Sequence, residues 1–392
     1  MPLDYLSVKQ QINKQASAAP AEVQRRSQLL AEASQKLRNS AADLSQIQSK
    51  VAEAAQYFDR LSCAIPTNEP LTASHPLPPM PETGTLIAID GSQIQPSPHE
   101  AVGFYLLNLG WISKEIGSPA APQTHSSSRI VLAGYQNAAL PNESGVSLER
   151  DSWERVQLAE LAADASPQPV ITLTDGVLEL WSGSSRSAEE FLAFETRLEE
   201  YLAALAQLEK MGAATAGYID KPRAGYVVRM LEVANAPPEA MPTIRDYRPY
   251  LGLTDIALFR DLIKPGERSS VFAFQFHLKE RYAGPLALHF FYINVGTQKS
   301  PWLARVEIPA WVAHNPALLD AIHAVLLYEC QLLGQISYPY VLHRAHELAV
   351  VRVEDREQVQ KLVSQALRAQ GLEPGPLSYK QSLKNLPGRT RR

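Results

Sequence analysis

Two Asp-Gly pairs are the first feature that could carry chemistry, because each follows a continuous apolar run. Asp90-Gly91 follows TLIAI (85–89), and Asp175-Gly176 follows PVITLT (169–174). Such runs are typical of strands buried on both faces, and a carboxylate at the end of a buried strand is held rigidly. Two such carboxylates on neighbouring strands can bind Mg²⁺ or Mn²⁺, and a two-ion site hydrolyses phosphodiesters. A plain turn is the alternative for each pair.

A third carboxylate is expected on the helix predicted over 147–165, which precedes the second Asp-Gly strand. Glu160 is the first candidate. Glu154 and Glu149 are its rivals, since helical spacing does not choose among them. A surface glutamate with no part in chemistry is the alternative for each.

The segment SYPYVLHRAHELAVV (337–351) brings further candidates close together. His346 suits Mn²⁺ as a ligand and can also carry a proton. Tyr338 could orient a water or contact a phosphate, and Arg344 could pair with a phosphate through two hydrogen bonds. The alternative is that His343 and His346 are merely polar positions at the start of a helix.

The elements that must position these residues follow the order of an RNase H-like core. Three strands come first, then a helix, a strand, a helix and a strand, over 85–90, 102–112, 128–134, 147–165, 169–174, 187–211 and 216–219. This order predicts an α/β fold in which helices flank a mixed sheet, and short connections favour an antiparallel meander for the first three strands. Lys221, just past the last strand, could neutralise a scissile phosphate or is an ordinary surface lysine.

Residues 1–63 are expected to form a helical, coiled-coil-like arm. An apolar residue recurs at every seventh position, at Val23, Leu30, Leu37, Leu44, Val51 and Phe58. This seam indicates either a long helix packed on the body of the protein or an arm used for dimerisation or partner docking. Residues 64–84 contain six prolines and are expected to be a linker or an extended strap.

A nuclease domain is expected over 85–353, with a β-rich extension at 222–312. Strands are predicted in that extension at 271–277, 287–295 and 302–309, and a helix follows over 316–334. Residues 354–392 are expected to form a C-terminal helix and a basic tail. The tail has five basic residues after Glu373 and no acid, so it either touches a nucleic-acid backbone or is a disordered, solubilising tail.

Composition excludes several classes of protein. No run approaches the roughly 20 apolar residues of a membrane helix, and the N-terminus has no apolar core of a signal peptide, so a soluble, cytoplasmic protein is expected. A net charge of −4 limits any DNA contact to a local basic patch or to metal ions. Two cysteines, Cys63 and Cys330, do not indicate a disulfide framework, and Cys330 is expected to be a buried thiol.

Known motifs for other chemistry are absent from the sequence. It has no Walker A loop, no GxGxxG after a strand, no GxSxG elbow and no HExxH helix. ATP hydrolysis and serine-hydrolase chemistry are therefore disfavoured.

Four motifs together resemble the NurA family of DNA-end-processing nucleases. In matching order they are IDGSQ (89–93), TLTDG (172–176), YIDK (218–221) and SYPYVLHRAHELAVV (337–351), within roughly residues 84–352. The resemblance implies an RNase H-like, dimeric, Mn²⁺-dependent exonuclease of 5′-to-3′ polarity that acts on DNA. It also implies internal cuts in single strands by some members, and a hexameric HerA-type ATPase as partner.

The resemblance further implies roles for single residues. Asp90, Asp175 and Glu160 would be the metal-binding carboxylates, His346 would complete the metal site, and Tyr338 would assist catalysis. Val177 departs from the pattern, because a serine is expected after the second Asp-Gly pair.

We therefore predict a homodimeric DNA nuclease that uses Mn²⁺ or Mg²⁺, with two ions, in DNA end processing and double-strand break repair. A non-catalytic adaptor of the same fold, docked on a HerA-type translocase, is the first alternative, and Val177 motivates it. An RNase H-like hydrolase of RNA or branched DNA is the second, because a fold does not fix the substrate.

Overall fold

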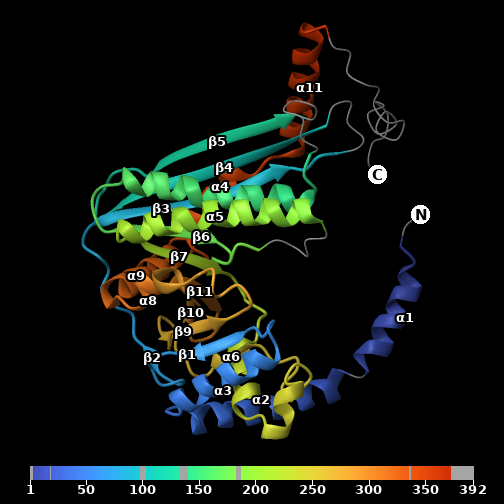
Figure 1. Ribbon diagram of the computed structural model, residues 1–392, viewed down its shortest axis with the longest axis vertical. Helices are drawn as coiled ribbons and strands as arrows, with labels where there is room; N and C mark the ends of the chain where they lie inside the picture. The colour runs from blue at the N-terminus through green and yellow to red at the C-terminus, as the bar shows by residue number, and fades with distance from the viewer. Residues whose placement is uncertain are drawn as a thin grey trace. The chain divides into compact units, whose positions relative to one another are not determined.

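The computed structural model describes residues 3–17, 19–97, 103–132, 140–181, 187–334 and 337–371. The chain divides into two compact units (Figure 1). Unit 1 comprises Met1–Pro79 and Tyr218–Leu327, and unit 2 comprises Met80–Gly217 and Tyr328–Arg392. Each unit is thus built from two separate stretches of chain. The expected nuclease domain at 85–353 was a single continuous stretch, and its residues are shared between the two units.

The sheet of unit 2 has the predicted strand order. β3 (Gly84–Ile94), β4 (Phe104–Ile116) and β5 (Gln123–Leu132) form an antiparallel meander, and β6 (Val170–Asp175) pairs in parallel with β3. β7 (Ala214–Ile219) lies next to β6, so the order is β7-β6-β3-β4-β5. The predicted α/β fold with an RNase H-like mixed sheet is confirmed.

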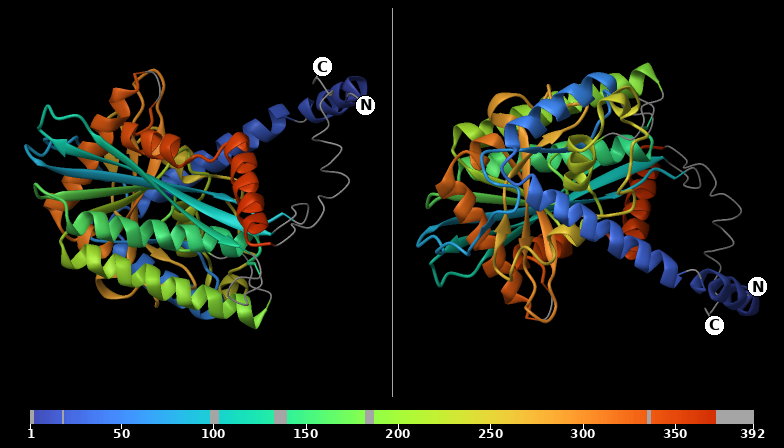
Figure 2. Two further views of the ribbon diagram at one scale, coloured as in Figure 1. Left: turned by 90° about the horizontal axis from the view of Figure 1, so that it is seen from above. Right: turned by 90° about the horizontal axis from the view of Figure 1, so that it is seen from below.

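Helices cover both faces of this sheet. α4 (Glu143–Ala163) and α5 (Ala188–Lys210) lie side by side along it (Figures 1 and 2), and α10 (Tyr340–Ala349) packs on β3 and β4. Trp111 of β4 lines a hollow together with residues of α4, whereas its neighbour Gly110 faces the backbone of α10. Because side chains alternate along a strand, α10 lies on the face opposite α4.

The two long helices begin where the sequence supplies caps. Asn142 accepts a hydrogen bond from the Gly145 amide at 2.9 Å at the start of α4. Ser187 and Glu190 form a capping box at the start of α5. Such caps satisfy amide groups that have no partner within the first turn.

Unit 1 holds the β-rich extension. β9 (Phe272–Gln275), β10 (Leu288–Asn294) and β11 (Leu303–Pro309) match the three strands predicted there, and β10 lies between the other two and pairs antiparallel with each. The remaining elements after β7 are α6 (Tyr226–Ala234), η1 (Pro238–Thr243), α7 (Asp255–Phe259), β8 (Arg268–Ser269), η2 (Gly284–Leu286), α8 (Ala310–Ala313), α9 (Pro316–Leu332) and α11 (Val353–Ala369). α9 and α11 correspond to the two helices predicted near the C-terminus.

The N-terminal region is three helices instead of one long arm. They are α1 (Tyr5–Ala16), α2 (Ala19–Asn39) and α3 (Leu44–Tyr57). α3 packs on α6 and buries Ile47, Val51 and Ala54, so the second half of the heptad seam belongs to the body of unit 1. α1 buries no residue, which leaves it available as an arm.

The proline-rich segment runs across unit 1 as a strap. β1 (Cys63–Pro66) pairs antiparallel with β9, and β2 (Ser74–His75) pairs antiparallel with β8. The strap alternative of the sequence analysis therefore describes this part of residues 64–84 better than a free linker does.

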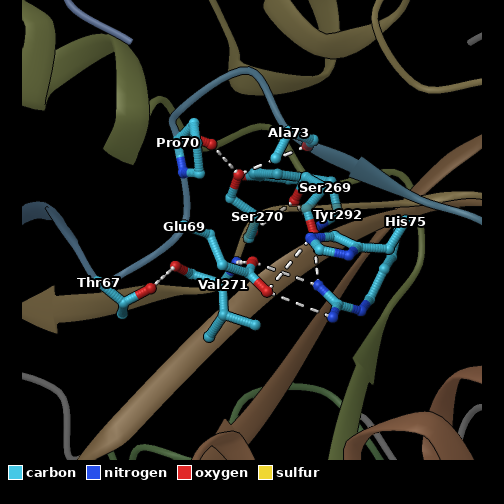
Figure 3. Close-up of polar contacts among 10 residues, drawn as sticks. Thr67, Glu69, Pro70, Ala73, His75, Ser269, Ser270, Val271 and Tyr292 are labelled. Carbon is cyan, nitrogen blue, oxygen red and sulfur yellow. Dashed lines mark hydrogen bonds and ion pairs between the residues drawn. The ribbon is translucent and has the colours of Figure 1, made fainter. Parts of the chain in front are cut away.

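Glu69 anchors the strap between its two short strands (Figure 3). Its carboxylate accepts a hydrogen bond from the Val271 amide at 2.8 Å and lies 3.2 Å from His75 Nε2 and 3.4 Å from Arg268 Nη1. Because each of these contacts lies within unit 1, they hold the strap to its strands.

Three further expectations can be compared with the fold. None of the helices in the described ranges is long and apolar enough to cross a membrane. Cys63 and Cys330 are both buried and lie outside any disulfide, and burial was predicted for Cys330. The basic tail lies outside the described residues, which end at residue 371.

Candidate active site

Asp90 and Asp175 follow the last paired residues of two neighbouring parallel strands. Ile89 of β3 is paired with Thr174 of β6, so each aspartate comes next on its own strand. β6 ends at Asp175, and Gly176 turns the chain with a φ of 97°, a conformation that favours glycine. β3 continues to Ile94, so the predicted strand end is found for Asp175 and not for Asp90.

The Asp90 carboxylate is held by two donors. Its Oδ1 accepts a hydrogen bond from the Gly91 amide at 2.8 Å, and its Oδ2 lies 2.7 Å from Nδ1 of His346. The Asp90 side chain is 18% exposed, whereas that of His346 is 61% exposed. With Nδ1 donating to Asp90, Nε2 of His346 is left as an acceptor for a proton or a metal ion.

α10 is fixed on the sheet by contacts at its C-terminal end, which sets the position of His346. Asn108 Nδ2 donates to the Ala349 carbonyl at 2.7 Å, and the Ser92 hydroxyl donates to the same oxygen. Gly110 has no side chain where the helix backbone passes, since a Cβ there would lie 2.5 Å from the Ala349 nitrogen. The close approach of helix and sheet therefore depends on a glycine in β4.

Glu154 of α4 lies against the backbone of β3. A Cβ added at Gly91 would lie 2.4 Å from Glu154 Oε1, so the absence of a side chain at residue 91 makes room for this carboxylate. The Glu154 side chain is only 13% exposed. The glycine after Asp90 thus brings a carboxylate of the helix next to the strand.

Negative charge gathers around Glu154. Burial, together with the neighbouring carboxylates of Asp151 and Asp90, raises the pKa of Glu154 well above its ordinary value, against the opposing effect of Arg150. Arg150 Nε lies 3.3 Å from Glu154 Oε1, and its Nη2 lies 2.5 Å from Asp151 Oδ1. Arg155 acts on Glu154 in the same direction, so two guanidinium groups face the three carboxylates of Glu154, Asp151 and Asp90, and a further cation would stabilise this arrangement.

A cleft of about 500 Å³ opens along α4 at the end of β6. Glu154, Asp151 and Arg150 line it from α4, and Asp175 lines it from β6. The cleft therefore joins the second Asp-Gly motif with the buried glutamate, while Asp90 acts on Glu154 through its charge.

Glu160, the first candidate for the third carboxylate, lies elsewhere. It is exposed and lines a separate hollow of about 470 Å³, together with Trp111 and His125, whose rings stack at 5.7 Å. Glu149, the other rival, accepts a hydrogen bond from the Tyr105 hydroxyl at 2.8 Å. Of the three glutamates, Glu154 is the one that shares a cleft with Asp175.

The remaining candidates occupy different settings. Tyr338 is half-buried just before α10, and Arg344 on α10 is paired with Glu347. Lys221 belongs to unit 1, where its ammonium group lies 5.2 Å from the centre of the Trp302 ring. Asp220 accepts a hydrogen bond from Trp302 Nε1 at 2.6 Å, so the two residues before Pro222 both contact one indole.

The donor set suits a divalent cation, although it does not enclose one. In the described ranges no three His, Cys, Asp or Glu side chains converge closely enough to hold an ion. Asp90, Glu154 and Asp175 nevertheless offer carboxylate oxygens, and His346 offers an imidazole nitrogen, which are donors that Mn²⁺ accepts. The shortage of positive charge around Glu154 is the structural observation that favours a cation here.

Arg150, Asp151 and Arg155 of α4 line the cleft but were not predicted from the sequence. Arg155 lines the cleft, is almost fully buried, and donates from Nη2 to the Thr174 hydroxyl at 3.2 Å. A signal was present, because Ser147, Arg150, Asp151 and Glu154 recur at helical spacing and so share one face of α4.

Comparison with protein families gives one match that covers most of the chain. The family model described as the NurA domain matches residues 84–351. A comparison with curated proteins gives no match.

Solved structures give distant similarities. The NurA nuclease from Sulfolobus solfataricus is 14% identical, over 85% of this chain and 97% of that chain, with a TM-score of 0.48. A NurA structure bound to dAMP and manganese is 13% identical, over 83% and 96%, with a TM-score of 0.37. Endonuclease V of Ciona intestinalis, in complex with inosine-containing DNA, is 14% identical, over 71% and 87%, with a TM-score of 0.28. These similarities are too weak to add to the family match.

Proposed function

Since the chain belongs to the NurA family and is a DNA nuclease, we propose that it degrades DNA from its ends with two bound divalent ions, Mn²⁺ or Mg²⁺. The finer proposal is an exonuclease of 5′-to-3′ polarity, with internal cuts in single strands as a second activity. Its role would be DNA end processing and double-strand break repair.

The cleft of unit 2 is the observation that supports this proposal. It brings Asp175 of β6 into one cleft with the largely buried Glu154 of α4, which lies against the backbone beside Asp90. We therefore propose Glu154, and not Glu160, as the third carboxylate.

We propose that Asp90, Glu154, Asp175 and His346 hold the metal ions. When bound, such ions supply a nucleophilic water and compensate the charge that develops on the phosphodiester. Asp90 orients the His346 imidazole through Nδ1, so Nε2 faces outward. Tyr338, next to α10, would contact the attacking water or a phosphate oxygen.

Positive charge for the DNA backbone would come from arginines of the cleft. Arg150 lines the cleft and is partly exposed, so a phosphate could reach it. Arg344 and Lys221 remain proposals for further phosphate contacts, because Arg344 is paired with Glu347 and Lys221 lies in unit 1.

A homodimer and a HerA-type hexameric ATPase are the proposed partners. The exposed α1 supports this proposal, because none of its residues is buried. Its apolar side chains Tyr5, Leu6 and Ile12, and that of Leu3 just before the helix, are exposed. A non-catalytic adaptor is less well supported, because the chain retains Asp90, Glu154 and Asp175, the carboxylates that the reaction would need.

A cleavage assay on end-labelled linear DNA tests the proposed function. We expect the wild-type protein to degrade the DNA in Mn²⁺ and not in EDTA. We expect no degradation by Asp90→Ala or Asp175→Ala, although circular dichroism should show that both variants are fully folded. Asp164→Ala is the matched control, because Asp164 is an exposed carboxylate that lines the other hollow. Cleavage by Asp90→Ala and Asp175→Ala at the wild-type rate would show that the assignment is wrong.

Two further substrate comparisons test the finer proposal. Label on the 5′ end should be released as short products before label on the 3′ end if polarity is 5′-to-3′. RNA of the same sequence should be left intact; equal cleavage of RNA and DNA would favour the broader RNase H-like hydrolase.

A further inference from the structure

Trp181 stands at the cleft with its ring largely in water. It lines the same cleft as Glu154 and Asp175, yet its side chain is 69% exposed. Val177, also exposed, lines the cleft on the same connection between β6 and α5. A large apolar surface therefore borders the carboxylates that are proposed to do the chemistry.

The other tryptophans of the chain are used within the fold. Trp111 stacks on His125, Trp153 lies under the Arg129 guanidinium at 4.4 Å, and Trp302 donates to Asp220. Trp311 also has an interaction partner, and all four are half-buried. Trp181 makes no ring or polar contact with any residue in the described ranges, so most of its ring surface is left for a ligand.

The connection that carries Trp181 is anchored on both sides of Glu179. Leu178 and Leu180 are buried, at 0% and 2% exposure. The Leu178 carbonyl accepts a hydrogen bond from the buried Tyr201 hydroxyl of α5 at 2.9 Å. Because the preceding residue, Leu180, is buried, the indole is held at the cleft with little further loss of conformational freedom on binding.

We propose that Trp181 is a stacking platform for an unpaired nucleobase of the strand that enters the cleft. A base and an indole stack face to face whatever the base, which suits an enzyme that must read through any sequence. A base can reach the ring only when it is not paired, so the platform selects single-stranded ends. This inference rests on the proposed function, because it places the substrate strand in the cleft of Glu154 and Asp175.

The test measures whether the contribution of Trp181 depends on the presence of bases. One ligand is a fluorescein-labelled oligothymidylate of about 12 nucleotides, within the usual range for single-strand sites. The other has the same length and backbone but abasic sugars throughout. Binding of both is followed by fluorescence anisotropy, in Ca²⁺ and separately in EDTA, for wild type, Trp181→Ala, Trp181→Phe and Phe191→Ala.

We expect Trp181→Ala to weaken binding of oligothymidylate about tenfold and that of the abasic strand less than about twofold. Trp181→Phe, which keeps an aromatic face, should lose no more than about threefold. Phe191→Ala is the matched control, since Phe191 is 57% exposed in the same unit and does not line the cleft. Its affinity for both strands should equal that of wild type.

Equal weakening of both ligands by Trp181→Ala, or no weakening of either, overturns the inference, as does the absence of measurable binding by wild type. The outcome is separate from that of the cleavage assay. A protein that shows the base-dependent loss but cuts no DNA keeps the stacking platform and loses the proposed function. A protein that cuts DNA without the base-dependent loss keeps the function and loses the platform.

Discussion

Replacing Glu154 by glutamine asks which carboxylate of α4 takes part in the reaction. Glu154 lies in the cleft against Gly91, and Glu160 lies on the same helix in a separate hollow. Glutamine keeps the size of glutamate and removes its charge. Glu154→Gln therefore changes the charge at the cleft with little effect on packing, and Glu160→Gln is a matched control on the same helix.

The expected loss of rate follows from the position of the Glu154 charge in the cleft. At an effective permittivity of about 20, two unit charges 4 Å apart interact by about 4 kcal/mol. Loss of a comparable stabilisation of a transition state lowers a rate by about 100-fold to 1,000-fold. We expect kcat of Glu154→Gln to fall by at least about 100-fold, and that of Glu160→Gln to change by less than about threefold.

The stability of Glu154→Gln should rise while its cleavage rate falls. Burial and the carboxylates of Asp151 and Asp90 oppose the charge on Glu154, so its removal should stabilise the metal-free protein by about 0.5–2 kcal/mol. Part of this gain is offset because Arg150 loses one of its partners.

Single-turnover cleavage of end-labelled DNA in saturating Mn²⁺ gives the rates, and urea unfolding in EDTA gives the stabilities. A large rate loss in Glu160→Gln together with a wild-type rate in Glu154→Gln would refute the reasoning from the cleft. A rate loss in Glu154→Gln with lower stability would instead point to damage to the fold.

Three further predictions concern the surroundings of the site and of unit 1. Gly91→Ala should displace the Glu154 carboxylate, since the new Cβ would lie 2.4 Å from Oε1. The cleavage rate should fall at least about tenfold while the circular dichroism spectrum stays the same, and an unchanged rate would contradict this prediction. His346→Ala should raise the Mn²⁺ concentration for half-maximal activity about 10-fold to 100-fold, as measured by metal titration, and an unchanged titration would remove His346 from the site. Burial lowers the pKa of His289 and of His323 to about 4. Both imidazoles therefore stay neutral in the folded protein at pH values below about 6.5, where the same side chains bind a proton in the unfolded chain. Stability should therefore be complete above that pH and fall as the pH drops towards 4, by up to roughly 3 kcal/mol for each histidine, and urea unfolding of His289→Gln should show a shallower fall than wild type.

The sequence was sufficient for the core of unit 2 because its signals are local. Continuous apolar runs predict buried strands, and their order with the helices predicts the RNase H-like sheet. The register that pairs Ile89 with Thr174, which the sequence does not predict, then places the two Asp-Gly motifs next to each other.

The choice of the third carboxylate was not local. Glu160 was favoured by its distance along the chain from Asp175, yet that distance depends on the connection between α4 and β6, whose path the sequence does not specify. The close approach of α4 to Gly91 is the observation that favours Glu154, and only the packed structure contains it. The strap was equally hidden, because its partners in β8 and β9 come about 200 residues later.

This separation has a consequence for synthesis of the chain. Cys63 of β1 pairs with Gln275 of β9, so β1 leaves the ribosome long before the strand that completes its hydrogen bonds. At 5–20 residues per second the delay is roughly 10–40 s. For most of that time the apolar face of α3 lacks α6, its partner in the finished unit. Unit 2 contributes residues 80–217 in the interval, so most of its sheet can form while unit 1 still waits for its second half.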